Sequence, residues 1–155
     1  MRTRRATEAD LATLTDLWMR MMAEHASFEP RLRLAPAART AYYCYLELHC
    51  RGPRSLVLLA EETGGTVHGF CCAYVCQNLA MFLPAEMGYV SDLYLVPEAR
   101  GKGLGREIMT MVLDWFRGQG VSSVQLQAYG ANGAGRAFWK AMGFDPFFER
   151  MNLDL

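Results

Sequence analysis

A glycine-rich segment, RGKGLG at residues 100–105, lies between a run typical of a strand, YVSDLYLVP, and a run with helical periodicity. Glycine loses more conformational freedom on folding than any other residue, so this density of glycine indicates a local requirement of the backbone. The first turn of a helix carries unpaired N–H groups and a partial positive charge, which together bind anions. Arg100 and Lys102 add full positive charges. The segment therefore predicts a strand, a loop and a helix, with a phosphate-type anion at the start of the helix.

The spacing of the glycines limits which phosphate ligand fits. The P-loop pattern GxxxxGK[ST] is absent. The dinucleotide pattern GxGxxG also fails, because Arg106 and Ile108 stand where its last glycine is required. A nucleotide-phosphate enzyme that uses ATP or NAD is therefore disfavoured. A turn that only lets strand and helix approach each other remains an alternative reading of the same glycines.

Composition supports one folded domain over residues 1–155, because a chain of this length with 52% hydrophobic residues can bury a full core. Lys and Arg number 16, as do Asp and Glu, so the net charge is zero and nucleic-acid binding is disfavoured. No apolar run approaches the roughly 20 residues that span a bilayer, so we expect no membrane partner. Glu8 and Asp10 interrupt the apolar region that a signal peptide requires, and we expect a cytoplasmic protein.

The cysteines predict free thiols. Their number, 5, is odd and low for a disulfide framework, which favours a reducing environment. A zinc site at Cys71, Cys72, Cys76 and His68 is the alternative, but this set lacks a CxxC pair. On a strand Cys71 and Cys72 would also point to opposite faces. We therefore expect no metal.

The rest of the chain alternates between strand-like and helical patterns, without repeats or an interdomain linker. Thr7 and Asn132 stand where helix N-caps are expected, and Gly64 and Gly65 predict the turn of an antiparallel hairpin. The expected strands are RTRRAT, SLVLLAEE, TVHGFCCAYVCQ, YVSDLYLVP, SSVQLQA and a final FFERMNLDL. The expected helices are TEADLATLTDLWMRMMAEHA, AARTAYYCYLELHC, residues 104–117 and NGAGRAFWKAMGF.

The segment DLYLVPEARGKGLG resembles the acetyl-coenzyme A signature R/Q-x-x-G-x-G/A of the GNAT superfamily of N-acetyltransferases, with Arg100, Gly103 and Gly105 at the signature positions. Downstream, ANGAGRAFWKAMGF is similar to the Asn-containing helix and Gly-Phe turn of that family. The resemblance extends over nearly the whole chain. It implies an α/β (α+β) fold with a mixed, mostly antiparallel sheet of six to seven strands and helices on both faces. It also implies that the sheet splays apart between the strands YVSDLYL and SVQLQA.

The resemblance also implies acetyl-CoA as the cosubstrate and a set of residues that hold it. Main-chain groups of three strand residues pair with the pantetheine arm, the glycine-rich loop holds the pyrophosphate, and an asparagine contacts the arm from the other side. The implied cofactor-binding residues are Leu93, Tyr94, Leu95, Arg100, Gly101, Lys102, Gly103, Leu104, Gly105 and Asn132.

The implied activity is transfer of an acetyl group to a primary amine by direct attack on the thioester. The amine must lose a proton, and Asp92 in the central strand is the expected catalytic base. A carboxylate that holds backbone or a cationic substrate is an equally good reading of Asp92. Many relatives carry a tyrosine that protonates the leaving thiolate at the position of Trp139, and an indole cannot donate that proton. Tyr129, Tyr94 or unassisted departure of the thiolate remain open.

The acceptor site is expected on the first two helices and on the loop at residues 79–87. Glu24, His25 and Tyr43 are the expected substrate-binding residues, and ordinary solvated or half-buried helix positions are the alternative. Polyamine, amino acid, peptide N-terminus, aminoglycoside and lysine side chain all remain open as acceptors. A non-catalytic acyl-CoA sensor or interaction domain is the alternative function. The exposed edge of the final strand would also permit a homodimer.

Overall fold

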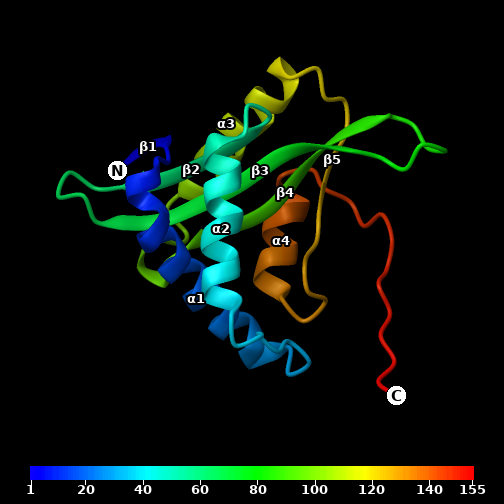
Figure 1. The fold of residues 1–155 in the computed structure, drawn as a ribbon, viewed down its shortest axis with the longest axis horizontal. Coiled ribbons are helices and arrows are strands. Elements are labelled where there is room, and N and C mark those ends of the chain that lie inside the picture. The colour runs from blue at the N-terminus through cyan, green and yellow to red at the C-terminus, as the bar shows by residue number, and fades with distance from the viewer.

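A mixed five-stranded sheet forms the centre of the structure, which is a computed structural model describing residues 1–155 (Figure 1). The strands follow one another in space as they do along the chain, in the order β1-β2-β3-β4-β5. All neighbours are antiparallel except β4 and β5, which run parallel. The strands are β1 (Arg2–Arg5), β2 (Ser55–Glu61), β3 (Val67–Gln77), β4 (Glu86–Leu95) and β5 (Val124–Leu126).

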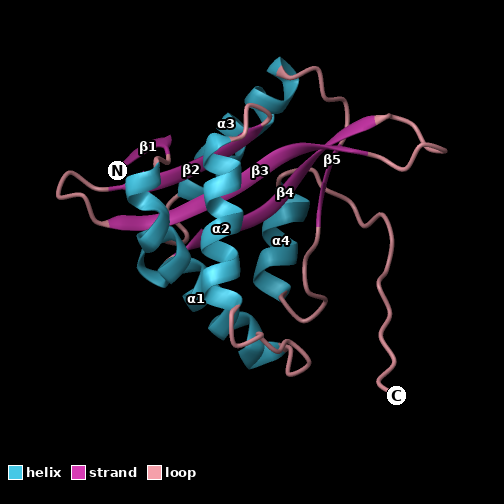
Figure 2. Ribbon diagram, viewed as in Figure 1, coloured by secondary structure: helices cyan, strands magenta, loops and turns pink.

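Four α-helices cover the two faces of this sheet (Figure 2). The first pair packs on one face, and the second pair lies on the other, where Phe116 approaches the strand backbone at Gly88. Short 3₁₀ turns precede the first and third helices. The helices are α1 (Leu11–Phe28), α2 (Ala38–Arg51), α3 (Leu104–Gly118) and α4 (Gly133–Ala141). The expected helices and the expected hairpin of β2 and β3 are therefore confirmed.

The expectation of six to seven strands is wrong, because the structure has five. The final strand predicted from FFERMNLDL does not form, and residues 142–155 contain no strand and lead away from α4 (Figure 1). Met151, Leu153 and Leu155 alternate as in a strand, yet all are exposed. A strand needs a hydrogen-bonded partner as well as alternation, and here the tail has none. A homodimer through the edge of that strand therefore loses its structural basis.

The core forms where the apolar faces of the helices meet the sheet. All residues of β2 from Ser55 to Ala60 are buried, as expected of a strand that is covered on both faces. Cys71 and Cys72 of β3 are fully buried free thiols, and burial raises the pKa of Cys72 to about 12. The two cysteines therefore act as small apolar side chains.

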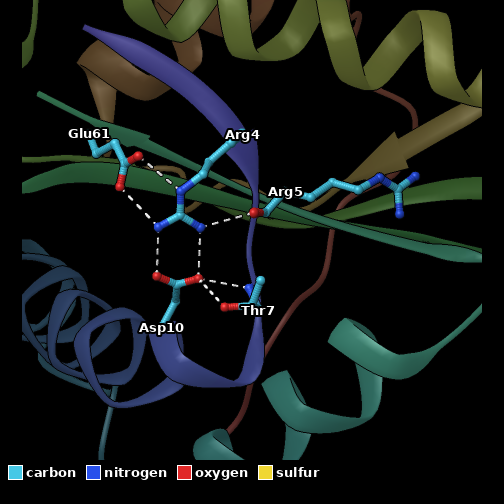
Figure 3. Close-up of polar contacts among 5 residues, drawn as sticks. All are labelled: Arg4, Arg5, Thr7, Asp10 and Glu61. Carbon is cyan, nitrogen blue, oxygen red and sulfur yellow. Dashed lines mark hydrogen bonds and ion pairs between the residues drawn. The ribbon is translucent and has the colours of Figure 1, made fainter. Parts of the chain in front are cut away.

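A cluster of ion pairs fastens the N-terminal strand to the start of α1 (Figure 3). The Arg4 guanidinium donates to both oxygens of Asp10, at 2.8 and 2.9 Å, and to both oxygens of Glu61 on β2. Thr7 is the N-cap residue of the 3₁₀ turn Glu8–Asp10 that precedes α1, and not of α1 itself, and its backbone N–H donates to the same Asp10 carboxylate at 2.8 Å. The hydrogen bonds from Arg4 lower the pKa of Asp10 to about 2. None of the residues in this cluster belongs to the glycine-rich loop.

Candidate functional site

The sheet splays apart between β4 and β5. The ladder joins only three residue pairs, from Gly88 with Val124 to Val90 with Leu126. The second half of β4, from Ser91 to Leu95, therefore has a ladder with β3 on one side and no strand on the other. Backbone N–H and C=O groups on such a free edge can pair with an extended ligand. The structure thus has, directly before the glycine-rich loop, a free strand edge that can pair with an extended, peptide-like ligand.

A β-bulge in β4 lies at the point where the strands diverge. Cys72 pairs with Asp92, but the next residue of β3, Ala73, pairs with Val90, so Ser91 is the extra residue. The bulge reverses the alternation of side chains along the strand. Gly88 before the bulge faces Phe116 of α3, and Leu95 after the bulge also faces α3, at Gly105. Ser91 and Asp92 consequently both lie on the face covered by α1 and α2.

Asp92 is a buried carboxylate, with only 8% of its surface exposed. Its Oδ2 accepts a hydrogen bond from the Ser91 hydroxyl at 2.6 Å. Burial raises the pKa of Asp92, and the nearby Ser91 hydroxyl, Tyr42 hydroxyl and Trp18 indole oppose that shift. A raised pKa makes a carboxylate a stronger base, which suits the predicted role in proton removal. The role itself stays a prediction.

The glycines of the loop serve two different purposes. Gly101 and Gly103 adopt left-handed backbone conformations, with φ of 72° and 85°, and a Cβ at either would meet only open space. Gly105 lies in the first turn of α3, and a Cβ there would press on the Phe138 ring of α4 at 3.3 Å. The first two glycines therefore shape the loop, and the third allows helix packing. Gly105 fits the packing reading, and the anion-binding reading of Gly101 and Gly103 stays a prediction.

The start of α3 suits an anion. Gly103 is the N-cap residue of the helix, and no side chain caps the first turn. The amides of that turn therefore have no side-chain acceptor, and the residues that precede it, Gly101 and Lys102, are exposed. A curled glycine backbone at a helix start is a known way to surround phosphate oxygens. The residues present thus fit the diphosphate that the sequence predicts.

Glu24 of α1 joins two residues of the expected cofactor site. Its carboxylate accepts a hydrogen bond from the Tyr94 hydroxyl at 2.6 Å and pairs with Arg100 at 2.7 Å. Arg100 also donates from Nε to the Leu95 carbonyl at 2.8 Å. Although burial acts to raise the pKa of Glu24, these partners lower it overall. The structure therefore brings an expected substrate residue against an expected cofactor residue.

Three further residues were expected in the site: His25, Tyr43 and Asn132. His25 packs against Phe28 and Tyr129, its Nδ1 is buried without a partner, and burial lowers its pKa. Tyr43 is 39% exposed and lies outside the aromatic contacts that its neighbour Tyr42 makes. Asn132 caps α4, because its side-chain oxygen accepts from the Gly135 amide at 2.9 Å. Its Nδ2 group remains as a donor.

The two tyrosines that the sequence offers as the general acid, Tyr94 and Tyr129, have raised pKa values. Burial raises the pKa of Tyr94 to about 12, and burial also raises the pKa of Tyr129. Trp139 is half-buried between Phe138 and Phe144, which agrees with a packing role. A tyrosine with a raised pKa is a poorer proton donor. Tyr94 and Tyr129 are therefore weaker acids than a free tyrosine, and departure of the thiolate without a protein acid stays a prediction.

An aromatic cluster beside Asp92 was missed at the level of the sequence. Six rings from four elements follow one another in contact, beginning with Trp18 stacked on Tyr42 at 4.1 Å. The helical spacing of Tyr42, Tyr45 and His49 is the signal that could have indicated a shared aromatic face. Their meeting with two strand tyrosines depends on the fold. The cluster comprises Trp18, Tyr42, Tyr45, His49, Tyr74 and Tyr89.

Two further features of the structure concern metals and membranes. No three His, Cys, Asp or Glu side chains come together in an arrangement that could hold a metal ion. No helix combines the length and the apolar character that crossing a bilayer demands.

Comparison with known proteins identifies the family. A profile described as the Acetyltransferase (GNAT) family matches residues 15–144. The chain is 34% identical over 70 residues to the mycothiol acetyltransferase of Beutenbergia cavernae. This match covers 43% of this chain but only 24% of that protein. It is 25% identical over 153 residues to the thialysine N-epsilon-acetyltransferase of Bos taurus, covering 94% of this chain and 85% of that protein. The chain belongs to the Acetyltransferase (GNAT) family.

A solved structure shows the same fold. A predicted acetyltransferase from Clostridium acetobutylicum, solved with acetyl-CoA, superimposes with a TM-score of 0.81 at 17% sequence identity. The match covers 99% of this chain and 95% of that one. The GNAT-like α/β fold implied by the sequence is therefore confirmed, apart from the number of strands.

Proposed function

We propose that this protein transfers an acetyl group from acetyl-CoA to a primary amine. The observation that carries the proposal is the continuity of two ligand-holding features on one stretch of chain. The free edge of β4, Ser91 to Leu95, leads within a few residues to the curled loop at the start of α3. An extended carrier with a diphosphate at one end and a thioester at the other matches that order. The family of the chain and its named relatives support the same activity.

The residues that hold the carrier divide by the part that they contact. The amides of residues 101–105, with Lys102, surround the diphosphate, and Arg100 fixes the loop to the end of β4 through the Leu95 carbonyl. Main-chain groups of Leu93, Tyr94 and Leu95 pair with the pantetheine arm, and the Nδ2 group of Asn132 contacts it from α4. Acetyl-CoA supplies an activated acyl carbon with a good leaving group.

The remaining chemistry falls to proton transfer and to placement of the amine. Asp92 accepts a proton from the incoming ammonium, so that the neutral nitrogen can attack. A new C–N bond forms as the C–S bond breaks, and the second proton lost by the nitrogen passes through water to the departing sulfur. A backbone N–H at the β4 bulge stabilises the developing negative charge on oxygen, and proximity supplies much of the rest.

The non-catalytic sensor remains the alternative function. A sensor would keep the loop and the free β4 edge without a working base. The buried Asp92 with its raised pKa favours the enzyme, because ionising a carboxylate in such surroundings is costly and a pure binding domain has no use for it.

A ligand titration followed by an activity assay tests the proposal. Coenzyme A and acetyl-CoA at about a hundred times Kd should stabilise the protein by about 2.7 kcal/mol, whereas ATP and NAD should not. Thiol release from acetyl-CoA should then depend on added amine. A preference for ATP or NAD would contradict the proposal, and binding of acetyl-CoA without turnover on any amine would favour the sensor.

A further inference from the structure

The rings of the aromatic cluster contact one another in sequence on the face of the sheet that α1 and α2 cover. Its rings continue from His49, stacked on Tyr74 at 4.5 Å, to Tyr89 at 5.6 Å from Tyr74. Tyr42 is buried, while Tyr45, Tyr74 and Tyr89 are half-buried. The aromatic cluster therefore extends from partly exposed rings to a ring in the protein interior.

A carboxylate lies at the inner end of this cluster. Burial is the main cause that raises the pKa values of Tyr42, Tyr45, Tyr74 and Tyr89, and the negative charge of Asp92 adds to the shift in all four. Four tyrosines thus lie within electrostatic reach of one buried carboxylate. Ammonium groups are attracted both to carboxylates and to the faces of aromatic rings.

One polar group at the inner end lacks a partner. The Tyr42 residue is only 7% exposed, and its hydroxyl makes no well-formed hydrogen bond although it lies close to Asp92. An unpaired buried hydroxyl costs free energy, and natural proteins rarely retain one without a use. A ligand with hydrogen-bonding capacity, placed between Tyr42 and Asp92, would satisfy it.

We propose that the acceptor is a primary monoamine with an apolar or aromatic body, bound with its ammonium at Asp92 and its body along the aromatic cluster. The inference rests on the proposed acetyl transfer and names the acceptor class for that same site. A phenylethylamine-type compound has this combination of one charge and one ring.

The charges around the cluster disfavour polyamines and aminoglycosides. Each additional ammonium needs its own anionic partner, and Asp92 is the only carboxylate that acts on all four tyrosines. Glu24 is engaged by Arg100 and Tyr94, and Glu86 by Arg54. At the outer end, the positive charge of Arg150 acts on Tyr89. A second ammonium would therefore meet repulsion at the end where it has to lie.

Equilibrium binding tests the acceptor class without requiring turnover. Calorimetric titrations of the protein saturated with coenzyme A should show 2-phenylethylamine binding at least about tenfold more tightly than spermidine or kanamycin. Equal or tighter binding of spermidine or kanamycin overturns the inference, and so does an absence of amine binding. Thermal stabilisation by acetyl-CoA is measured separately, so a failed acceptor assignment is distinguished from a failed acetyl-CoA site.

Two substitutions of aromatic residues test whether the aromatic cluster binds the amine. Tyr74→Leu and Tyr89→Leu keep apolar surface but remove the ring, and each should raise Kd and KM for 2-phenylethylamine about three- to tenfold. The Kd for acetyl-CoA should not change. Phe147→Leu, in the exposed tail, is the matched control and should leave all three constants unchanged. Unaltered Kd and KM for the amine in both tyrosine variants would overturn the inference.

A third substitution separates binding from folding. Tyr42→Phe removes the hydroxyl that lies close to Asp92 without a well-formed hydrogen bond, so the free energy of unfolding should change by less than about 1 kcal/mol. The Kd for 2-phenylethylamine should nevertheless increase, because the bound ammonium loses a hydrogen-bond partner. A variant that loses stability and binds the amine normally would show that the hydroxyl serves the fold alone, and would contradict this placement of the ammonium.

Discussion

The glycine-rich loop follows the end of β4, whereas Asp92 lies within that strand, and the two regions are built in opposite ways. The loop is contained in six consecutive residues, 100–105, of which residues 100–103 are exposed, and most of the groups that it offers to a ligand belong to the backbone. The Asp92 region is buried, consists of side chains, and draws them from α1, α2, β3 and β4. The loop can recognise a common ligand through its amides alone. The Asp92 region can vary its side chains without altering the loop, which suits recognition of a particular acceptor.

The largest expected effect separates the loop from ordinary glycine turns. Gly103→Val should raise the Kd for acetyl-CoA at least about a hundredfold, because a branched side chain opposes the left-handed conformation and occupies the ligand's space. The strain should lower the free energy of unfolding by about 1–2 kcal/mol. Isothermal titration and chemical denaturation measure the two quantities.

Gly65→Val is the matched control for that substitution. Gly65 also has a positive φ, 82°, and open space at its Cβ, but it lies in the turn between β2 and β3. It should lose similar stability and keep normal acetyl-CoA affinity. Unchanged affinity in Gly103→Val as well would remove the distinction between the two turns.

The next largest effect is expected on substitution of the buried Asp92. Asp92→Asn should lower kcat/KM at neutral pH about 10- to 100-fold, with partial recovery at higher pH, where more amine is already neutral. Affinity for acetyl-CoA should be retained. A variant with the pH profile of the native enzyme would exclude Asp92 from proton transfer.

The same residue predicts how stability depends on pH. The folded state raises the pKa of Asp92, so the folded state binds this proton more tightly than the unfolded state. Its contribution is favourable at pH values below the unfolded pKa and is lost as the pH rises through the raised value. Asp92→Asn should therefore be at least as stable as the native protein at pH 7 in urea denaturation, and a clear loss would contradict the burial argument.

A remote substitution should affect stability without affecting either region. Asp10→Asn breaks the Arg4 cluster and should lower the free energy of unfolding at pH 7 by about 1–2 kcal/mol, given a shift from 3.8 to about 2. Because that pKa is lowered, the native stabilisation is present above about pH 4 and disappears as the pH falls toward 2. Denaturation curves across this range should converge for the two proteins, and kinetic constants measured at pH 7 should coincide.

The smallest expected effect lies beside the loop, at the ion pair of Glu24 with Arg100. Glu24→Gln removes a negative charge beside Arg100 and should tighten acetyl-CoA binding about two- to fivefold, while stability changes by less than about 1 kcal/mol. Glu8→Gln, which breaks an exposed pair with Arg51, is the control. Weaker acetyl-CoA binding in Glu24→Gln would show instead that the carboxylate positions Arg100 for the ligand.

The sequence predicted the loop well because its signal is local. Spacing, helix-start chemistry and flanking charge all fall within RGKGLG, and the helices and hairpin have clear periodicity. The surroundings of Asp92 could not be predicted, because the bulge at Ser91 and the contact of His49 with Tyr74 arise only from packing of distant elements. The final strand failed for the same reason, since alternation in the tail does not supply a partner strand.

A crystal structure of the protein with acetyl-CoA tests the central claim most directly. The diphosphate should contact the amides of residues 101–105, and the pantetheine arm should lie along the free edge of β4 with its thioester near Asp92. A diphosphate bound elsewhere, with the loop at the start of α3 empty, would contradict the account.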